Sequence, residues 1–72
     1  MSTDEGDVAM RVGRNLRSIR EKRGLSQNEM AKVIGMDLAR YGRIERGLVN
    51  LKLQSVERLA DRLGVDPLDF FR

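Results

Sequence analysis

The chain has 72 residues and contains no cysteine and no histidine, which excludes several classes of protein. A disulfide framework, a thiolate metal site, a Ser-His-Asp triad and a histidine zinc site are all impossible without these residues. A single domain of this length leaves little room for an enclosed substrate pocket, so we expect neither an enzyme nor a cofactor or small-molecule ligand. Because so small a core stabilises a fold only weakly, a dimer partner would help.

Positive charge is concentrated in one part of the chain. Residues 1–10 carry three acidic side chains and no basic one, residues 11–46 carry ten basic and four acidic, and residues 47–72 carry four of each. A basic surface is typical of phosphate binding, but a solvated helix face has the same composition. The apolar runs are too short to span a bilayer and the acidic start lacks the apolar segment of a secretory signal. We therefore expect a cytoplasmic protein with no membrane partner.

The first predicted helix covers residues 8–23 and follows an acidic tail, residues 1–7, that we expect to be disordered. The apolar side chains of this helix recur at steps of three and four residues, which is typical of a face packed on a core. They are Val8, Val12, Leu16 and Ile19. Gly24 follows the basic end of the segment and is suited to terminate the helix.

The next two helices form a helix-turn-helix. Ser26 and Glu29 have the spacing of a capping box, so a second helix begins after Ser26 and ends at Gly35. Asp37 is a suitable N-cap for a third helix that runs to about Arg46. The side chains expected to face the core are Met30, Ala31, Ile34, Tyr41 and Ile44. In DNA-binding proteins the second helix of such a pair enters the major groove, although other helical corners meet the same structural demands.

Two further helices complete the prediction. The fourth covers residues 53–63 before Gly64, and Asp66-Pro67 begins a short fifth helix that ends at Phe71. The apolar residues assigned to one side of the fourth helix are Leu53, Val56, Leu59, Ala60 and Leu63. No segment alternates with period two, so we expect no sheet. The sequence therefore predicts one all-α domain over residues 8–72, a compact five-helix bundle that contains the helix-turn-helix.

The sequence resembles the Cro/repressor (XRE) family of helix-turn-helix regulators. The residues that carry the resemblance are Leu25-Ser26-Gln27-Asn28-Glu29-Met30-Ala31, Gly35, Arg43-Ile44-Glu45-Arg46-Gly47, Leu53, Leu59-Ala60, Leu63-Gly64-Val65 and Phe70. The resemblance covers residues 12–71. It implies a lambda-repressor-like fold of five helices and a transcription regulator of bacterial or phage type that binds double-stranded DNA.

A narrower similarity is to the controller proteins of restriction–modification systems, which are small dimeric regulators of their own operon. Residues 50–57 and the Phe70-Phe71 ending carry it. Phage Cro-like repressors and plasmid or prophage regulators fit nearly as well.

The resemblance also implies a role for each matched position. The positions that would face bases in the groove are Asp37, Leu38, Ala39, Gly42 and Arg43. Arg40, on the same helix, is added as a base-facing candidate that could also reach a phosphate. The positions that would contact phosphates are Gln27, Arg46 and Asn50. A buried ion pair between Arg20 and Glu45 would tie the first helix to the third.

Three positions depart from the family pattern. Leu38 and Ala39 stand where the family is usually polar; they cannot hydrogen-bond a base but can pack on a thymine methyl. Arg43 is then the best candidate for a bidentate contact to guanine. Lys52 stands where the family often has a serine or threonine cap, so Lys52 is a candidate phosphate contact instead. Two alternatives stay open: Leu38 as a half-buried spacer and Arg40 as plain surface charge.

Leu68 and Phe71, with part of the fourth helix, are candidates for a two-fold dimer interface. So small a bundle cannot bury every apolar residue of the C-terminal segment, and Phe70 fits the core position. The alternative is that Phe71 folds back over the core of its own domain. A dimer would place two recognition helices about 34 Å apart on a palindromic operator. RNA polymerase is a further partner if the protein activates transcription.

Two alternative functions remain. An antitoxin would use the same domain to repress its operon while also binding a toxin. A protein-interaction module would not bind DNA at all, and it predicts acidic or apolar side chains where Arg40, Arg43 and Arg46 stand.

Overall fold

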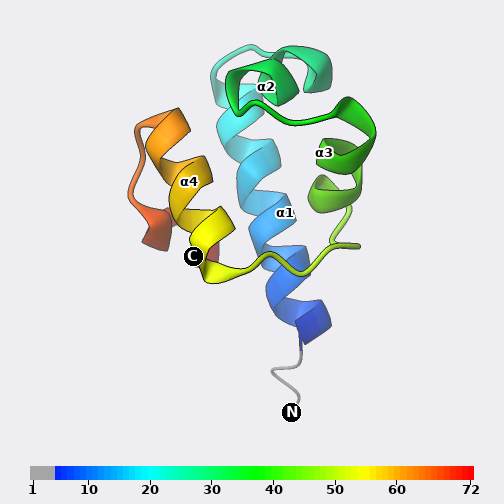
Figure 1. The fold of residues 1–72 in the computed structure, drawn as a ribbon, viewed down its shortest axis with the longest axis vertical. Coiled ribbons are helices and arrows are strands. Elements are labelled where there is room, and N and C mark those ends of the chain that lie inside the picture. Colours follow the sequence, from blue (N-terminus) through cyan, green and yellow to red (C-terminus); the bar gives the residue numbers. More distant parts are fainter. Residues whose placement is uncertain (1–4) are drawn as a thin grey trace.

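The computed structural model describes residues 5–72, and its longest element, helix α1 (Glu5–Lys22), runs through the middle of the molecule (Figure 1). The described part of the helix already includes residues 5–7, before the predicted start at Val8, so the predicted disordered tail is wrong for them. The negative charge of Asp7 is favourable near the N-terminal end of a helix. Residues 1–4 of the predicted tail lie outside the described residues.

The inward face of α1 differs from the prediction at its start. Val12 and Leu16 are buried as predicted, and Ile19 packs against the core. Val8 was wrongly assigned to this face, since it is 44% exposed while Ala9 is 6% exposed. Ala9 lies closer to the angular position of Leu16 on the helix, seven residues on, so Ala9 takes the inward place.

The helix-turn-helix consists of α2 (Gln27–Val33) and α3 (Leu38–Glu45), joined by a short turn. The predicted capping box is present: Ser26 Oγ accepts from Glu29 N at 3.1 Å, and Glu29 Oε1 accepts from Ser26 N at 2.8 Å. Asp37 caps α3 as predicted, accepting from Arg40 N at 3.0 Å. In the turn, Gly35 has a positive φ, a left-handed conformation that glycine adopts without steric cost.

The last two elements are α4 (Leu53–Leu63) and the 3-10 helix η1 (Pro67–Phe71). The predicted fifth α-helix is therefore a 3-10 helix, a geometry that is common in pieces as short as one turn. Asp66 caps it, accepting from Leu68 N at 3.0 Å. Leu53 was wrongly assigned to the inward side of α4: it is 70% exposed, because it occupies the first helical position, beyond the edge of the core.

One hydrophobic core joins all five elements. Its buried members are Val12, Leu16, Met30, Ala31, Ile34, Tyr41, Ile44, Val56, Leu59, Ala60, Leu63 and Phe70. Tyr41 and Phe70 are the largest of them and are completely buried. The core residues predicted on the second and third helices are thus confirmed. Among the helices of residues 5–72, none has the length and apolar composition needed to cross a membrane.

Candidate nucleic-acid interface

Helix α3 divides its side chains between the core and the solvent. Tyr41 and Ile44 fill the core, so the opposite side of the helix is turned outward. Ala39, Arg43 and Arg46 are all exposed, and they follow one another at steps of four and three residues, which places them on that outward side. The packing of α3 on the core therefore determines which of its side chains are available to a ligand.

Five of the six positions predicted to face bases are exposed. They are Asp37, Leu38, Ala39, Arg40 and Arg43. Leu38 is 44% exposed and is not a member of the core cluster. The sixth position, Gly42, is buried, and a Cβ built on it would meet Arg46 Nη1 at 3.5 Å. Gly42 thus has no side chain to present, and Arg46 covers its position.

The outward side of α3 and its C-cap is positively charged. Arg40, Arg43 and Arg46 are all exposed. None of the three forms an ion pair within the described part of the chain, where the salt bridges are Arg17–Glu21, Arg20–Glu45 and Arg72–Asp69. Positive charge that no acidic neighbour neutralises attracts polyanions such as the DNA backbone.

The candidate phosphate contacts lie on three different segments. Gln27 is the first residue of α2, Asn50 lies in the loop after α3, and Lys52 is the N-cap of α4; all three are exposed. Lys52 makes no side-chain cap hydrogen bond. Its ammonium group is therefore not used to cap the helix, and an ammonium cannot accept the hydrogen bond that a cap requires.

The ion pair implied by the family resemblance is present. Arg20 Nε lies 2.6 Å from Glu45 Oε2 and Arg20 Nη2 lies 3.3 Å from Glu45 Oε1, so the contact is bidentate. The two side chains are 14% and 4% exposed, respectively. Arg20 Nη1 also donates to the carbonyl of Leu25 at 3.0 Å, so the guanidinium holds the loop before α2 as well as α3.

Glu45 accepts two more hydrogen bonds, which local sequence patterns do not predict. The hydroxyl of Tyr41 donates to Glu45 Oε2, and Gln27 Nε2 donates to Glu45 Oε1 at 3.1 Å. Gln27 is thus held by the third helix, and the amide keeps a second N–H free for another acceptor. A buried tyrosine hydroxyl needs a hydrogen-bond partner, so the prediction that Tyr41 is a core residue could have indicated this part of the network.

These hydrogen bonds decide the charge of Glu45. Burial by itself raises the pKa of this carboxyl, but the hydrogen bonds from Arg20, Tyr41 and Gln27 outweigh burial and hold the pKa below its ordinary value of 4.5. The hydrogen bond to Glu45 raises the pKa of Arg20, and burial, followed by the bond to Glu45, raises the pKa of Tyr41. The network is therefore a charged pair plus a neutral phenol.

Gly13 sets the distance between α1 and α3. A Cβ at this position would lie 2.3 Å from the carbonyl oxygen of Ile44 and 2.5 Å from that of Glu45. No side chain fits at this position. The two helices therefore approach more closely than they could with any residue other than glycine at position 13. Sequence reasoning missed this role. A glycine inside a long helix is unfavourable by about 1 kcal/mol relative to alanine. Its presence within the first predicted helix could have indicated a close contact with another helix.

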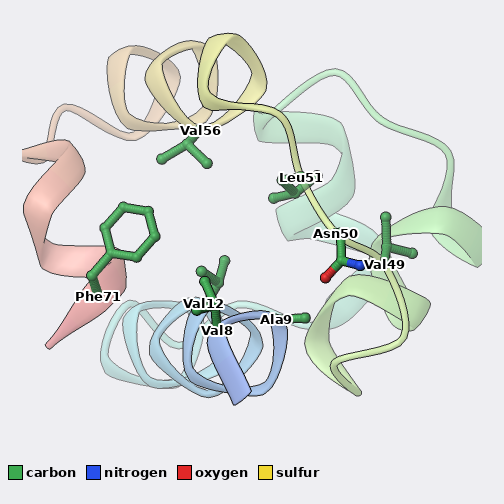
Figure 2. A pocket seen from close by; sticks show the side chains of 8 residues that line it. All are labelled: Val8, Ala9, Val12, Val49, Asn50, Leu51, Val56 and Phe71. Atoms are coloured by element: carbon green, nitrogen blue, oxygen red, sulfur yellow. The ribbon is translucent and has the colours of Figure 1, made fainter. Parts of the chain in front are cut away.

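An apolar cleft of about 270 Å³ lies between α1, the loop before α4, α4 itself and η1 (Figure 2). Its lining residues are Val8, Ala9, Val12, Val49, Asn50, Leu51, Val56 and Phe71. The ring of Phe71 points into the cleft toward Val56, and Phe71 packs against the core. Phe71 therefore folds back over its own domain, whereas Leu68 remains 65% exposed.

Comparison with known proteins places the chain in a family. The family model described as a helix-turn-helix domain matches residues 11–70. The control protein C.MunI of a Mycoplasma species is 35% identical over 66 residues, which cover 90% of this chain and 89% of that protein. A hypothetical transcription factor of Neisseria meningitidis serogroup B is 36% identical over 62 residues; these cover 86% of this chain and only 58% of the Neisseria protein.

A solved structure agrees with both the fold and the family. The restriction–modification controller protein C.AhdI from Aeromonas hydrophila superposes with a TM-score of 0.78 at 35% identity, over 88% of this chain and 96% of that one. The chain therefore belongs to the Cro/repressor-like helix-turn-helix family of DNA-binding transcription regulators, which are not enzymes, and restriction–modification controller proteins are among its homologues.

Proposed function

We propose that this protein binds a palindromic operator in double-stranded DNA as a homodimer and controls a restriction–modification operon. The observation that carries the proposal is the outward side of α3, where Arg40, Arg43 and Arg46 are exposed and form no ion pair with any residue between 5 and 72. The controller proteins C.MunI and C.AhdI, which match most of this chain, support the restriction–modification context.

Arg43 is the residue proposed to determine sequence. It lies four residues after Ala39 on the outward side of α3, and its guanidinium can donate two hydrogen bonds to the O6 and N7 atoms of guanine. Asp37, Leu38, Ala39 and Arg40 complete the proposed base-facing set. The proposed backbone contacts are Gln27, Arg46, Asn50 and Lys52, which would hold the helix in register without contributing sequence preference.

A second copy of the chain is the proposed partner that covers Leu68. This side chain is 65% exposed, and it belongs to the same short helix, η1, as Phe71, which lines the apolar cleft. Two copies also match the two-fold symmetry of a palindromic operator. RNA polymerase would be a further partner if the protein activates its promoter.

Selection from a random double-stranded DNA pool at about 150 mM salt, a physiological ionic strength, tests the proposal. We expect an enriched motif with two-fold symmetry. A single enriched half-site would retain the DNA function and contradict the dimer. No enrichment, with binding that disappears as salt rises, would contradict sequence-specific binding and favour a protein-interaction module.

Two variants test the assigned contacts on the selected operator. Arg43→Ala is expected to cost about 1–3 kcal/mol and to relax the preference at one base pair per half-site. Arg46→Ala is the control, expected to weaken binding to all sequences about equally because a phosphate contact carries no sequence information. An Arg43→Ala variant with unchanged affinity and preference would contradict the assignment.

A further inference from the structure

The first two residues of α3, Leu38 and Ala39, offer DNA no side-chain hydrogen-bonding group. Asp37 uses its carboxylate to accept from Arg40 N at 3.0 Å, and Leu38 and Ala39 carry only carbon beyond their backbones. Both apolar side chains are exposed, Leu38 to 44%. The side chains of Leu38 and Ala39 can therefore contact a ligand only through apolar groups.

The surroundings of Leu38 point to a nucleic acid and not to an apolar protein partner. Arg40 and Arg43, on the same helix, are also exposed and form no ion pair with the other described residues. A protein interface built on leucine is depleted of charge at its centre. An exposed leucine on a helix that also carries unpaired arginines suits a ligand with dense negative charge and an isolated apolar group.

In the major groove of DNA the only apolar group on a base edge is the methyl on carbon 5 of thymine. We propose that Leu38 recognises a carbon-5 methyl group on a pyrimidine, and that 5-methylcytosine therefore substitutes for thymine at that base. The methyl of 5-methylcytosine occupies the same place on the ring and projects into the same groove. This inference rests on the proposed function, and it makes affinity depend on cytosine methylation wherever an operator carries cytosine in place of that thymine.

The test uses the operator obtained by selection, with single bases replaced. Uracil in place of each thymine removes the methyl and leaves base pairing unchanged. We expect one thymine per half-site at which uracil weakens binding roughly fourfold, the effect of one buried methyl group. When cytosine paired with guanine replaces that thymine–adenine pair, 5-methylcytosine should bind tighter than cytosine by a similar factor.

Two variants assign the effect to Leu38. Leu38→Ala should bind the thymine and uracil operators with nearly equal affinity, whereas Leu38→Met, which keeps an apolar chain of similar length, should retain the preference. Val33→Ala is the matched control: Val33 is 41% exposed at the end of α2 and belongs to no proposed contact, so this variant should keep the full preference.

The outcomes separate this inference from the proposed function. An enriched operator in which no thymine responds to uracil would overturn the inference and leave the DNA-binding function standing. A uracil effect that persists in Leu38→Ala would overturn the role of Leu38, and equal binding of cytosine and 5-methylcytosine would overturn the recognition of methylated cytosine. The absence of any enriched sequence would overturn the proposed function itself.

Discussion

Glu45 connects α1 to α3 through a buried network of hydrogen bonds. Its carboxylate, 4% exposed, accepts hydrogen bonds from Arg20 on α1, Tyr41 on α3 and Gln27 on α2, so one side chain joins all three helices. Such a buried charge is tolerated only while its partners are present. The same carboxylate orients Gln27, so stability and the geometry of a proposed phosphate contact are coupled at this residue.

Removing Arg20, the charged partner of Glu45, should strongly destabilise the fold. Arg20→Met is expected to lower the free energy of unfolding by about 3 kcal/mol, because it leaves Glu45 buried and unpaired. Urea unfolding followed by circular dichroism measures the loss.

Arg17→Met is the matched control for this variant, because the Arg17–Glu21 pair is largely exposed, at 64% and 56% for its two side chains. Exposed ion pairs contribute little to stability, so we expect only a small change in the free energy of unfolding, within about 0.5 kcal/mol. Equal losses in the two variants would contradict a special role for the buried pair.

The lowered pKa of Glu45 predicts the direction of the acid response. The folded-state pKa lies below the ordinary value of 4.5. The contribution of this group to stability is therefore complete above the ordinary pKa and is lost as the pH falls through the folded pKa. We expect the free energy of unfolding to decrease in that range. Carbon-13 NMR titration of the Glu45 carboxyl should give a midpoint below 4.5, and a midpoint at or above this value would show that burial outweighs the hydrogen bonds.

At the scale of the elements, the crossing of α1 and α3 leaves no room for a side chain at Gly13. Gly13 faces the carbonyl groups that end α3, and these are backbone atoms, which cannot move aside as the tip of a side chain can. Arg20 is seven residues farther along α1, about two turns, and forms the ion pair with Glu45 of α3. A close backbone approach and a buried charge pair therefore determine how the recognition helix sits on the rest of the fold.

An alanine at Gly13 should separate the two helices. Gly13→Ala is expected to cost at least about 2 kcal/mol, since overpacking outweighs the gain in helix propensity. Gly42→Ala is the matched control within α3. Its Cβ would meet only Arg46 Nη1, at 3.5 Å, so this variant should unfold at the same or a slightly higher temperature than the wild type. Thermal unfolding compares the two, and a Gly13→Ala variant as stable as Gly42→Ala would contradict the close approach.

At the scale of the whole molecule, the C-terminal end of the fold has two different surfaces. Phe70 is completely buried and Asn15 Nδ2 donates to its carbonyl at 2.8 Å, which fastens η1 to α1. Phe71 closes one side of the apolar cleft, while Leu68 stays exposed. The helix η1 can thus be anchored to its own domain by two phenylalanines and still offer a leucine to a second copy.

Leu68 should therefore affect association without affecting folding. Leu68→Ala is expected to weaken dimerisation about tenfold or more, the effect of removing a leucine side chain that becomes buried on assembly. Sedimentation at micromolar concentration measures the change, and thermal unfolding at low concentration should be nearly unaltered. Val33→Ala, which changes another exposed apolar side chain, should dimerise as the wild type does. A wild type that is strictly monomeric, or a Leu68→Ala dimer of unchanged affinity, would contradict the proposed interface.

The sequence by itself determined the elements and most of the core. Capping residues such as Ser26, Asp37 and Asp66, apolar periodicity and glycine-marked turns act over a few residues, so they can be recognised without tertiary contacts. The family resemblance supplied the Arg20–Glu45 pair. The tertiary structure alone decided which residues at the ends of helices are covered: Val8 and Leu53 continue an apolar pattern past the edge of the core and are exposed.

Tertiary structure also decided the contacts between segments distant in the chain. The closeness of Gly13 to α3 and the convergence of Tyr41 and Gln27 on Glu45 depend on how the helices cross. The burial of Gly42 and the return of Phe71 over its own domain likewise depend on which neighbours the fold brings against them. Local periodicity contains no information about these distances, because they are set by the packing of whole helices around one core.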